Sequence, residues 1–220
     1  MTRTGVAWLT LLVLLAGCAP GPIQGPTGPP TVSDLPAQSS SPADAAPATR
    51  AFAEDGLQMD YPATWREFHY EVRSSFSDVI AYLGTIEVAD PCTRTATEVT
   101  CGRGFELPPG GIVVVVEHRG FPGYDILTNP MDDGRSVLLQ VAGLPARRAL
   151  TGPDQASGAD QVLAWSISEP GFVDNYYAVT AYLRGPGVVV QTAQVDAMVK
   201  GLRFDHPVVP VPTASGSPQL

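Results

Sequence analysis

The chain has 220 residues, of which 44% are hydrophobic and 16% charged, enough apolar material for one folded domain with additional segments. Its formal net charge of −9, with no basic cluster to offset it, argues against a protein that binds nucleic acid phosphates. The 22 prolines gather towards the two ends, so we expect a folded middle between two disordered ends.

Residues 1–17 predict a lipoprotein signal peptide. An arginine precedes Gly5–Ala16, an apolar run too short to cross a membrane core, which needs roughly 20 residues. The run ends in Leu15-Ala-Gly-Cys18, which resembles a bacterial lipobox, where the cysteine thiol takes a diacylglyceryl group and the signal is cut just before it. An ordinary secreted protein with a chance cysteine at this place is the alternative. We therefore expect lipidation of Cys18 and a stable anchor through its acyl chains.

Residues 18–50 contain this cysteine followed by a Pro-, Ser- and Ala-rich stretch without apolar periodicity, which predicts a disordered tether. Fully extended, such a tether would reach on the order of 100 Å. Residues 207–220 are again rich in proline and serine and predict a disordered tail. A single globular domain is therefore expected over residues 51–206.

Strand patterns dominate the expected domain. The segment Leu57–Tyr61 alternates and stops at Pro62, and Val79–Val88 is rich in β-branched and aromatic residues. The segment Ile112–Val116 is a continuous apolar run, as in a strand covered on both faces. The remaining expected strands are Val137–Val141, Ala146–Leu150, Leu163–Ile167 and Tyr177–Leu183, with turns at 143–145 and 169–174.

The segment 89–111 joins two of the best strands, yet it has over twenty residues and neither strand nor helix periodicity over most of its length. Hairpin loops usually have 2–5 residues, and long ordered loops are usually functional. Because Cys18 is assigned to the lipid, Cys92 and Cys101 remain as a pair, which predicts a disulfide in an oxidising compartment. Two free or metal-binding thiols are the alternative.

A disulfide would pre-organise this loop and so lower the entropy lost when a partner binds. Arg94, Arg103 and Phe105 are the candidate partner-binding residues of the loop, because guanidinium groups recognise carboxylates or phosphates and a phenyl ring supplies an anchor. The alternative is that the disulfide only steadies a variable surface loop.

One helix is expected near the end of the domain. Val195, Met198, Val199 and Leu202 are spaced i, i+3, i+4 and i+7 and form one apolar stripe. A series of antiparallel strands followed by a helix predicts an α+β sandwich, in which the helix lies on a mostly antiparallel sheet.

The run Gly56-Leu-Gln-Met-Asp-Tyr-Pro-Ala-Thr-Trp65 resembles the opening strand of Mog1/PsbP-like domains, which often reads G-hydrophobic-x-hydrophobic-x-YP-x-x-W. The run Val195–Phe204 is similar to their final helix and strand, and the middle of the chain is similar to uncharacterised actinobacterial envelope proteins. The resemblance implies a curved, mostly antiparallel sheet with helices packed on it. It also implies an accessory or binding role, since this fold carries no single activity.

Motifs for catalysis or cofactor binding are not evident. His69, His118 and His206 share no motif, so no metal site is expected. The chain has no Gly-x-Ser-x-Gly elbow, no dinucleotide fingerprint and no Walker-type lysine, so we expect neither an enzyme nor a bound cofactor. Trp65 and Trp165 are expected in the core rather than in a sugar-binding platform.

The sequence therefore predicts a lipoprotein anchored in the cell membrane, on its extracytoplasmic side, with a non-catalytic binding or accessory role in the cell envelope. Its expected partners are the membrane, through the lipid anchor, and an envelope protein, lipid or glycan of unknown identity. A structural component of an envelope assembly is the alternative, and an enzyme with a dispersed site is a weaker one.

Overall fold

A computed structural model of the chain describes residues 48–127, 136–172 and 174–205. The predicted signal peptide, Cys18, nearly all of the predicted tether, His206 and the predicted tail lie outside the described residues. The first described strand begins at Thr49, two residues before the domain start expected from the composition.

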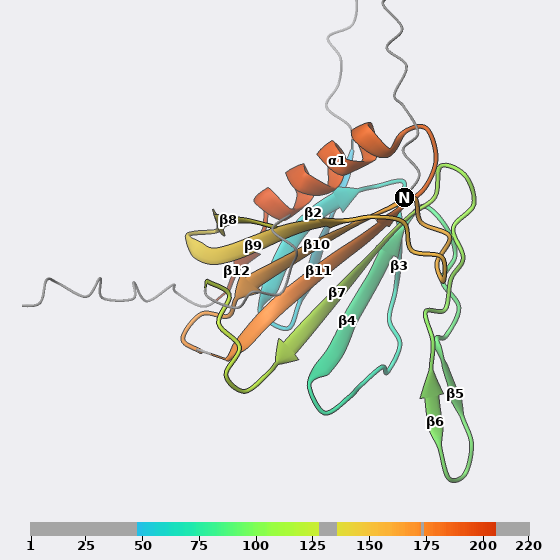
Figure 1. The fold of residues 1–220 in the computed structure, drawn as a ribbon, viewed down its shortest axis with the longest axis horizontal. Helices are drawn as coiled ribbons and strands as arrows, with labels where there is room; N and C mark the ends of the chain where they lie inside the picture. Colours follow the sequence, from blue (N-terminus) through green and yellow to red (C-terminus); the bar gives the residue numbers. More distant parts are fainter. Residues whose placement is uncertain (1–47, 128–135, 173, 206–220) are drawn as a thin grey trace, which may run out of the picture. The chain divides into compact units, whose positions relative to one another are not determined.

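The main element of the fold is a seven-stranded antiparallel sheet in the order β3-β4-β7-β11-β10-β9-β8 (Figure 1). Its apolar centre is β7, where five consecutive residues from Ile112 to Val116 are buried, as expected for a strand covered on both faces. The strands are β3 (Arg66–Phe68), β4 (Ser77–Gly84), β7 (Ile112–Gly120), β8 (Ser136–Val141), β9 (Leu144–Thr151), β10 (Gln161–Ser168) and β11 (Asn175–Leu183).

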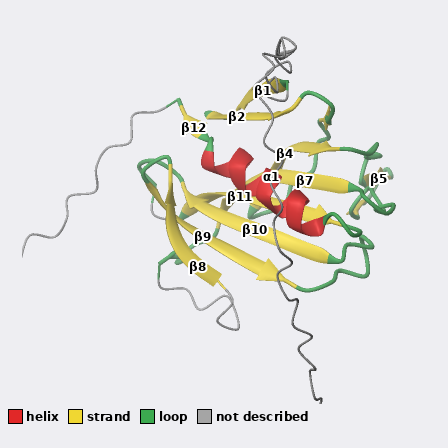
Figure 2. Cartoon of the chain, turned by 90° about the horizontal axis from the view of Figure 1, so that it is seen from above, coloured by secondary structure: helices red, strands yellow, loops and turns green. Residues whose placement is uncertain are grey.

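One face of the large sheet is covered by a helix and a small sheet, which Figure 2 shows side by side above the long strands. The helix α1 spans Val188–Lys200, and the small sheet has the order β1-β2-β12. Its strands are β1 (Thr49–Glu54), β2 (Leu57–Pro62) and β12 (Arg203–Phe204). The main core lies between these layers, and it contains Phe52, Leu57, Met59, Trp65, Leu83, Val114, Trp165, Val179, Val195, Val199 and Leu202.

Irregular segments cover the opposite face. Residues from the 85–111 connection, among them Val88 and Leu107, pack on Tyr82, Val113 and Val115 of the large sheet. A smaller cluster joins Tyr124 and Ile126 to Tyr176 and Ala178 of β11. The sheet is therefore buried on both faces although only one face carries a helix. The fold is a mostly antiparallel β-sheet with one helix in the described residues, so its helical content is smaller than the expected packing of several helices.

Two expected boundaries are wrong. The strand predicted over Val79–Val88 spans Ser77–Gly84, because the chain leaves the sheet after Gly84 and Val88 packs instead on Tyr82 and Val113. The turn expected at 143–145 consists of Ala142 and Gly143, which have φ values of 51° and 81°. Left-handed conformations at two consecutive positions are typical of tight hairpin turns, so Leu144 already belongs to β9.

Candidate interaction surfaces

The segment predicted as a long aperiodic loop contains a short hairpin. Its strands are β5 (Cys92–Arg94) and β6 (Val99–Cys101), which pair antiparallel with Cys92 opposite Cys101. The predicted disulfide is confirmed, with an S–S distance of 2.04 Å and Cα atoms 4.0 Å apart. The sequence shows no strand period here because strands of three residues are too short to produce one.

The hairpin projects from the body of the domain, as the green ribbon in Figure 1 shows. Every residue from Thr93 to Cys101 is exposed, and Val99 is 59% exposed although it is apolar. Only Cys92, at the start of β5, is buried. The disulfide therefore fixes an element whose own side chains pack little against the rest of the protein.

Arg94 holds the first strand of the hairpin to the domain. Its guanidinium lies 2.8 Å from the carboxylate of Asp90 and donates to the backbone carbonyl of Glu71 at 2.6 Å. The backbone N–H of Cys92 donates to the same carboxylate, and this bond, with Arg94, lowers the pKa of Asp90. Arg94 remains partly exposed, with 39% of its side chain accessible.

Arg103 and Phe105 lie at the base of the hairpin and pack on the large sheet. The guanidinium of Arg103 lies 3.1 Å from the carboxylate of Asp154 and 4.8 Å from the ring centroid of Tyr182. Phe105 makes an edge-on contact with the same tyrosine, with ring centroids 5.3 Å apart. Burial raises the pKa of Tyr182 even though Arg103 opposes the shift. All three residues predicted to contact a partner are thus engaged in positioning the loop, and their direct use by a partner remains a prediction.

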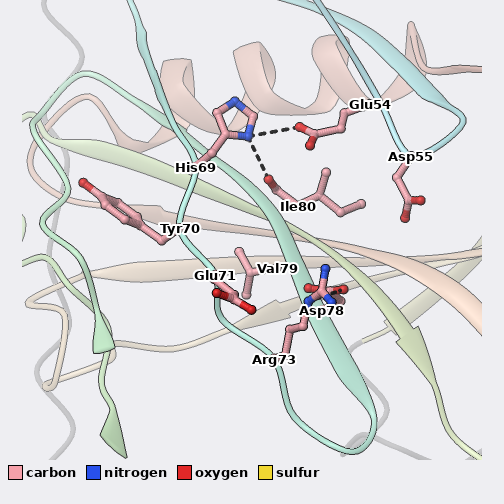
Figure 3. A pocket seen from close by; sticks show the side chains of 9 residues that line it. All are labelled: Glu54, Asp55, His69, Tyr70, Glu71, Arg73, Asp78, Val79 and Ile80. Atoms are coloured by element: carbon pink, nitrogen blue, oxygen red, sulfur yellow. Dashed lines mark hydrogen bonds and ion pairs between the residues drawn. The ribbon is translucent and has the colours of Figure 1, made fainter. Parts of the chain in front are cut away.

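A polar pocket of about 270 Å³ lies between the β1–β2 turn and the start of β4 (Figure 3). Its lining includes Glu54, His69, Arg73, Asp78 and Ile80. No sequence motif connects these residues, because they come from separate strands and turns. Among the described residues, no group of three or more His, Cys, Asp or Glu side chains is arranged to hold a metal ion.

His69 has a hydrogen-bond acceptor at each ring nitrogen. Its Nε2 lies 2.8 Å from Glu67, and its Nδ1 lies 3.0 Å from Glu54 and 3.1 Å from the carbonyl oxygen of Ile80. Burial alone would lower the pKa of His69, but the hydrogen bond to Glu67 and the charge of Glu54 outweigh it and raise the pKa. The hydroxyl of Tyr61 donates to Glu67 at 2.6 Å, and burial together with this bond raises the pKa of Tyr61 to about 12.

These groups predict a pH-dependent stability. Because the pKa of His69 is raised from 6.5, its contribution is complete below 6.5 and is lost as the pH rises through the folded-state pKa. Burial would raise the pKa of Glu67, but the hydrogen bonds from Tyr61 and His69 outweigh it and lower this pKa from 4.5. The stability that ionised Glu67 contributes is therefore lost only as the pH falls through its folded-state pKa. We expect the free energy of unfolding to decrease between pH 6 and pH 8.5 by less than about 1 kcal/mol, since His69 is well exposed.

Urea unfolding of the wild type and of His69→Gln at both pH values checks this prediction. In His69→Gln the free energy of unfolding should decrease less between the two pH values than in the wild type. His118→Gln removes a second partly buried histidine and is the matched control, which should keep the wild-type decrease. His118 lies 3.0 Å from Glu169, outside the Tyr61–Glu67–His69 network. An equal pH dependence in the wild type and in His69→Gln would contradict the assignment.

No family model matches the sequence, and no curated protein matches it. Among solved structures, the chain is similar to the solution structure of cyanobacterial PsbP (CyanoP) from Synechocystis, with 11% identity and a TM-score of 0.42, over 76% of this chain and 98% of CyanoP. It is also similar to a crystal structure from Bacteroides thetaiotaomicron, with 12% identity and a TM-score of 0.37, over 70% of this chain. The matched region is 47% of the Bacteroides chain, so this protein spans about half of that length. At these TM-scores neither similarity carries an argument about function.

Within the part of the chain that the structure describes, no helix is long and apolar enough to cross a membrane.

Proposed function

We propose that the protein is a lipoprotein, anchored through Cys18 on the extracytoplasmic side of the cell membrane, with a non-catalytic binding role in the cell envelope. The apolar run Gly5–Ala16 and the lipobox-like Leu15–Cys18 support the anchor, and the Pro-rich residues 19–50 supply a tether. We further propose an actinobacterial origin and kinship with Mog1/PsbP-like domains. The kinship is supported by Gly56–Trp65, which forms β2 and a buried tryptophan, and by Val195–Phe204, which forms the end of α1 and β12.

The observation that carries the binding role is the disulfide-stapled hairpin β5–β6. A stretch of nine residues from Thr93 to Cys101 is exposed, while its base is fixed by the disulfide, Arg94 and Arg103. An element that is rigid before binding loses little conformational entropy when a partner docks on it. The exposed isopropyl group of Val99, opposite Arg94 in the register, provides an apolar contact beside a cation. In this proposal Arg103 and Phe105 position the hairpin.

Site-specific photo-crosslinking in living cells tests the proposal. A photoreactive phenylalanine analogue at Val99 is expected to give adducts of discrete mass with an envelope component after irradiation. The analogue at Val190 of α1, which is 74% exposed, is the matched control and is expected to give none of these adducts. Adducts that appear equally at both positions, or at neither, would contradict a binding role of the hairpin.

A structural role in an envelope assembly is the second candidate function, favoured by the apolar side chains on the edge strand β8, where Val137 is 59% and Leu138 51% exposed. Exposed apolar edges pair readily with other strands. The same crosslinker placed at Leu138 distinguishes the two functions. A structural assembly through β8 predicts adducts at Leu138 that do not depend on the hairpin, whereas a binding role of the hairpin alone predicts adducts at Val99 and none at Leu138.

A further inference from the structure

A second depression adjoins the pocket of Figure 3 at the start of β4. It has a volume of about 190 Å³ and is lined by the turn 73–78 together with His118 and Gly120 of β7. Arg73 and Asp78 line both depressions, so the two adjoin at this ion pair near the start of β4, and we refer to them together as the trough. A trough of this kind accepts an elongated ligand rather than a single small molecule.

Two phenylalanines form an apolar wall at one end of the trough. Phe76 lines the second depression, and its ring lies 4.9 Å from the ring of Phe121, centroid to centroid. Both are about half exposed, at 49% and 50%, which is unusual for large apolar side chains. The backbone N–H of Gly120 donates to the carbonyl of Phe76 at 3.0 Å, and the N–H of Phe121 donates to the carbonyl of Asp174 at 3.1 Å. The aromatic wall is therefore held in place before any ligand arrives.

Carboxylates outnumber cations in the trough: Glu54, Asp55, Glu71 and Asp78 line it, and Arg73 is the one arginine or lysine among its described lining residues. Arg73 lies 3.1 Å from Asp78, His69 lies 3.0 Å from Glu54, and His118 lies 3.0 Å from Glu169. The hydroxyls of Ser74 and Ser75 add exposed hydrogen-bonding groups without charge. A phosphate or an anionic membrane surface would meet these carboxylates without a free cation to bind, so the trough fits an uncharged ligand that both donates and accepts hydrogen bonds.

We propose that this trough binds a neutral oligosaccharide. A pyranose ring presents C–H groups on its faces and hydroxyls around its rim, which matches a phenyl wall next to paired donors and acceptors. One sugar unit would pack on Phe76 and Phe121 and hydrogen-bond to the Arg73–Asp78 pair. The next unit would extend towards His69. The proposal rests on the residues of the trough and does not depend on the hairpin β5–β6.

An NMR titration of the ¹⁵N-labelled chain without its signal peptide tests the proposal, with maltohexaose, mannohexaose and chitohexaose as probes and glucose as the monomer control. At least one hexasaccharide should shift the amide signals of residues 73–78 and 120–121, and should bind more tightly than glucose. Phe76→Ala and Arg73→Ala should each weaken this binding about tenfold, the equivalent of 1.4 kcal/mol. Phe172→Ala removes a phenylalanine that is 60% exposed and lines neither depression, and it should change the affinity less than about twofold.

The proposal is overturned if none of the three hexasaccharides shifts these signals, or if Phe76→Ala and Phe172→Ala have equal effects on binding. Vesicles of phosphatidylcholine with phosphatidylglycerol and a polylysine peptide are tested in parallel. Binding of either that requires Phe76, in the absence of saccharide binding, would assign the wall to a membrane or to a cationic protein and would also overturn the proposal. Val99→Arg should leave saccharide binding unchanged, so a failure of the hairpin proposal can be told apart from a failure of this one.

Discussion

Replacing Cys18 with alanine is expected to remove essentially all of the protein from the membrane fraction, or to leave it as an unprocessed precursor. A diacylglyceryl cysteine supplies two acyl chains, each buried CH₂ contributes about 0.8 kcal/mol, and stable anchoring requires about two such chains. Because the alanine variant has no thiol to acylate, the effect should be nearly complete rather than graded. Fractionation of cells into membrane, periplasmic and medium fractions, followed by immunoblotting, measures it.

The matched control for this experiment is the double variant Cys92→Ser and Cys101→Ser, which loses two cysteines but keeps Cys18 and should stay in the membrane fraction. Mass spectrometry of the wild-type N-terminus should show a mature chain that begins at a lipidated Cys18. A Cys18→Ala protein that is still cleaved after Gly17 and still sediments with membranes would rule out the lipid anchor and with it the proposed localisation.

Replacing both Cys92 and Cys101 with serine is expected to lower the free energy of unfolding by about 2.7 kcal/mol, the chain-entropy value for a closed loop of about ten residues. In a domain of this size such a loss corresponds to a decrease in melting temperature of roughly 5–10 °C. The hairpin itself should open more than the sheet, because residues 93–101 have few contacts apart from the disulfide and Arg94. Thermal unfolding with and without reductant, and amide hydrogen exchange of the hairpin, measure the two effects.

Reductant should lower the melting temperature of the wild type to that of the double variant and should not affect the variant. If the variant melts at the wild-type temperature and its hairpin amides exchange no faster, the contacts of Arg94 and Arg103 alone hold the hairpin, and the disulfide does not pre-organise it. The photo-crosslinking yield at Val99 in the double variant then shows whether a partner requires a fixed hairpin.

The strands with the clearest local pattern were predictable because their burial follows directly from side-chain alternation. Along β10, Leu163, Trp165 and Ile167 point into one core, and in β7 the run from Ile112 is buried throughout, as the apolar sequence implies. The disulfide was predictable because cysteines are few and one of the three was already assigned to the lipid. Strands of three residues, such as β3, β5 and β6, carry no period and could not be recognised.

The sequence by itself determined the expected segments of the chain, the predicted anchor at Cys18, the main strands and the apolar stripe of α1, because each of these depends on residues that are close together along the chain. Only the tertiary structure decided which residues form surfaces. Phe76 and Phe121 are brought together by the antiparallel pairing of β4 with β7, whereas Glu54 reaches His69 because the small sheet packs on the large one. It likewise turned Arg103 and Phe105 inward onto Tyr182, a ring some eighty residues further along the chain, because burying the aromatic ring and pairing the guanidinium stabilise the loop base more than leaving both in water.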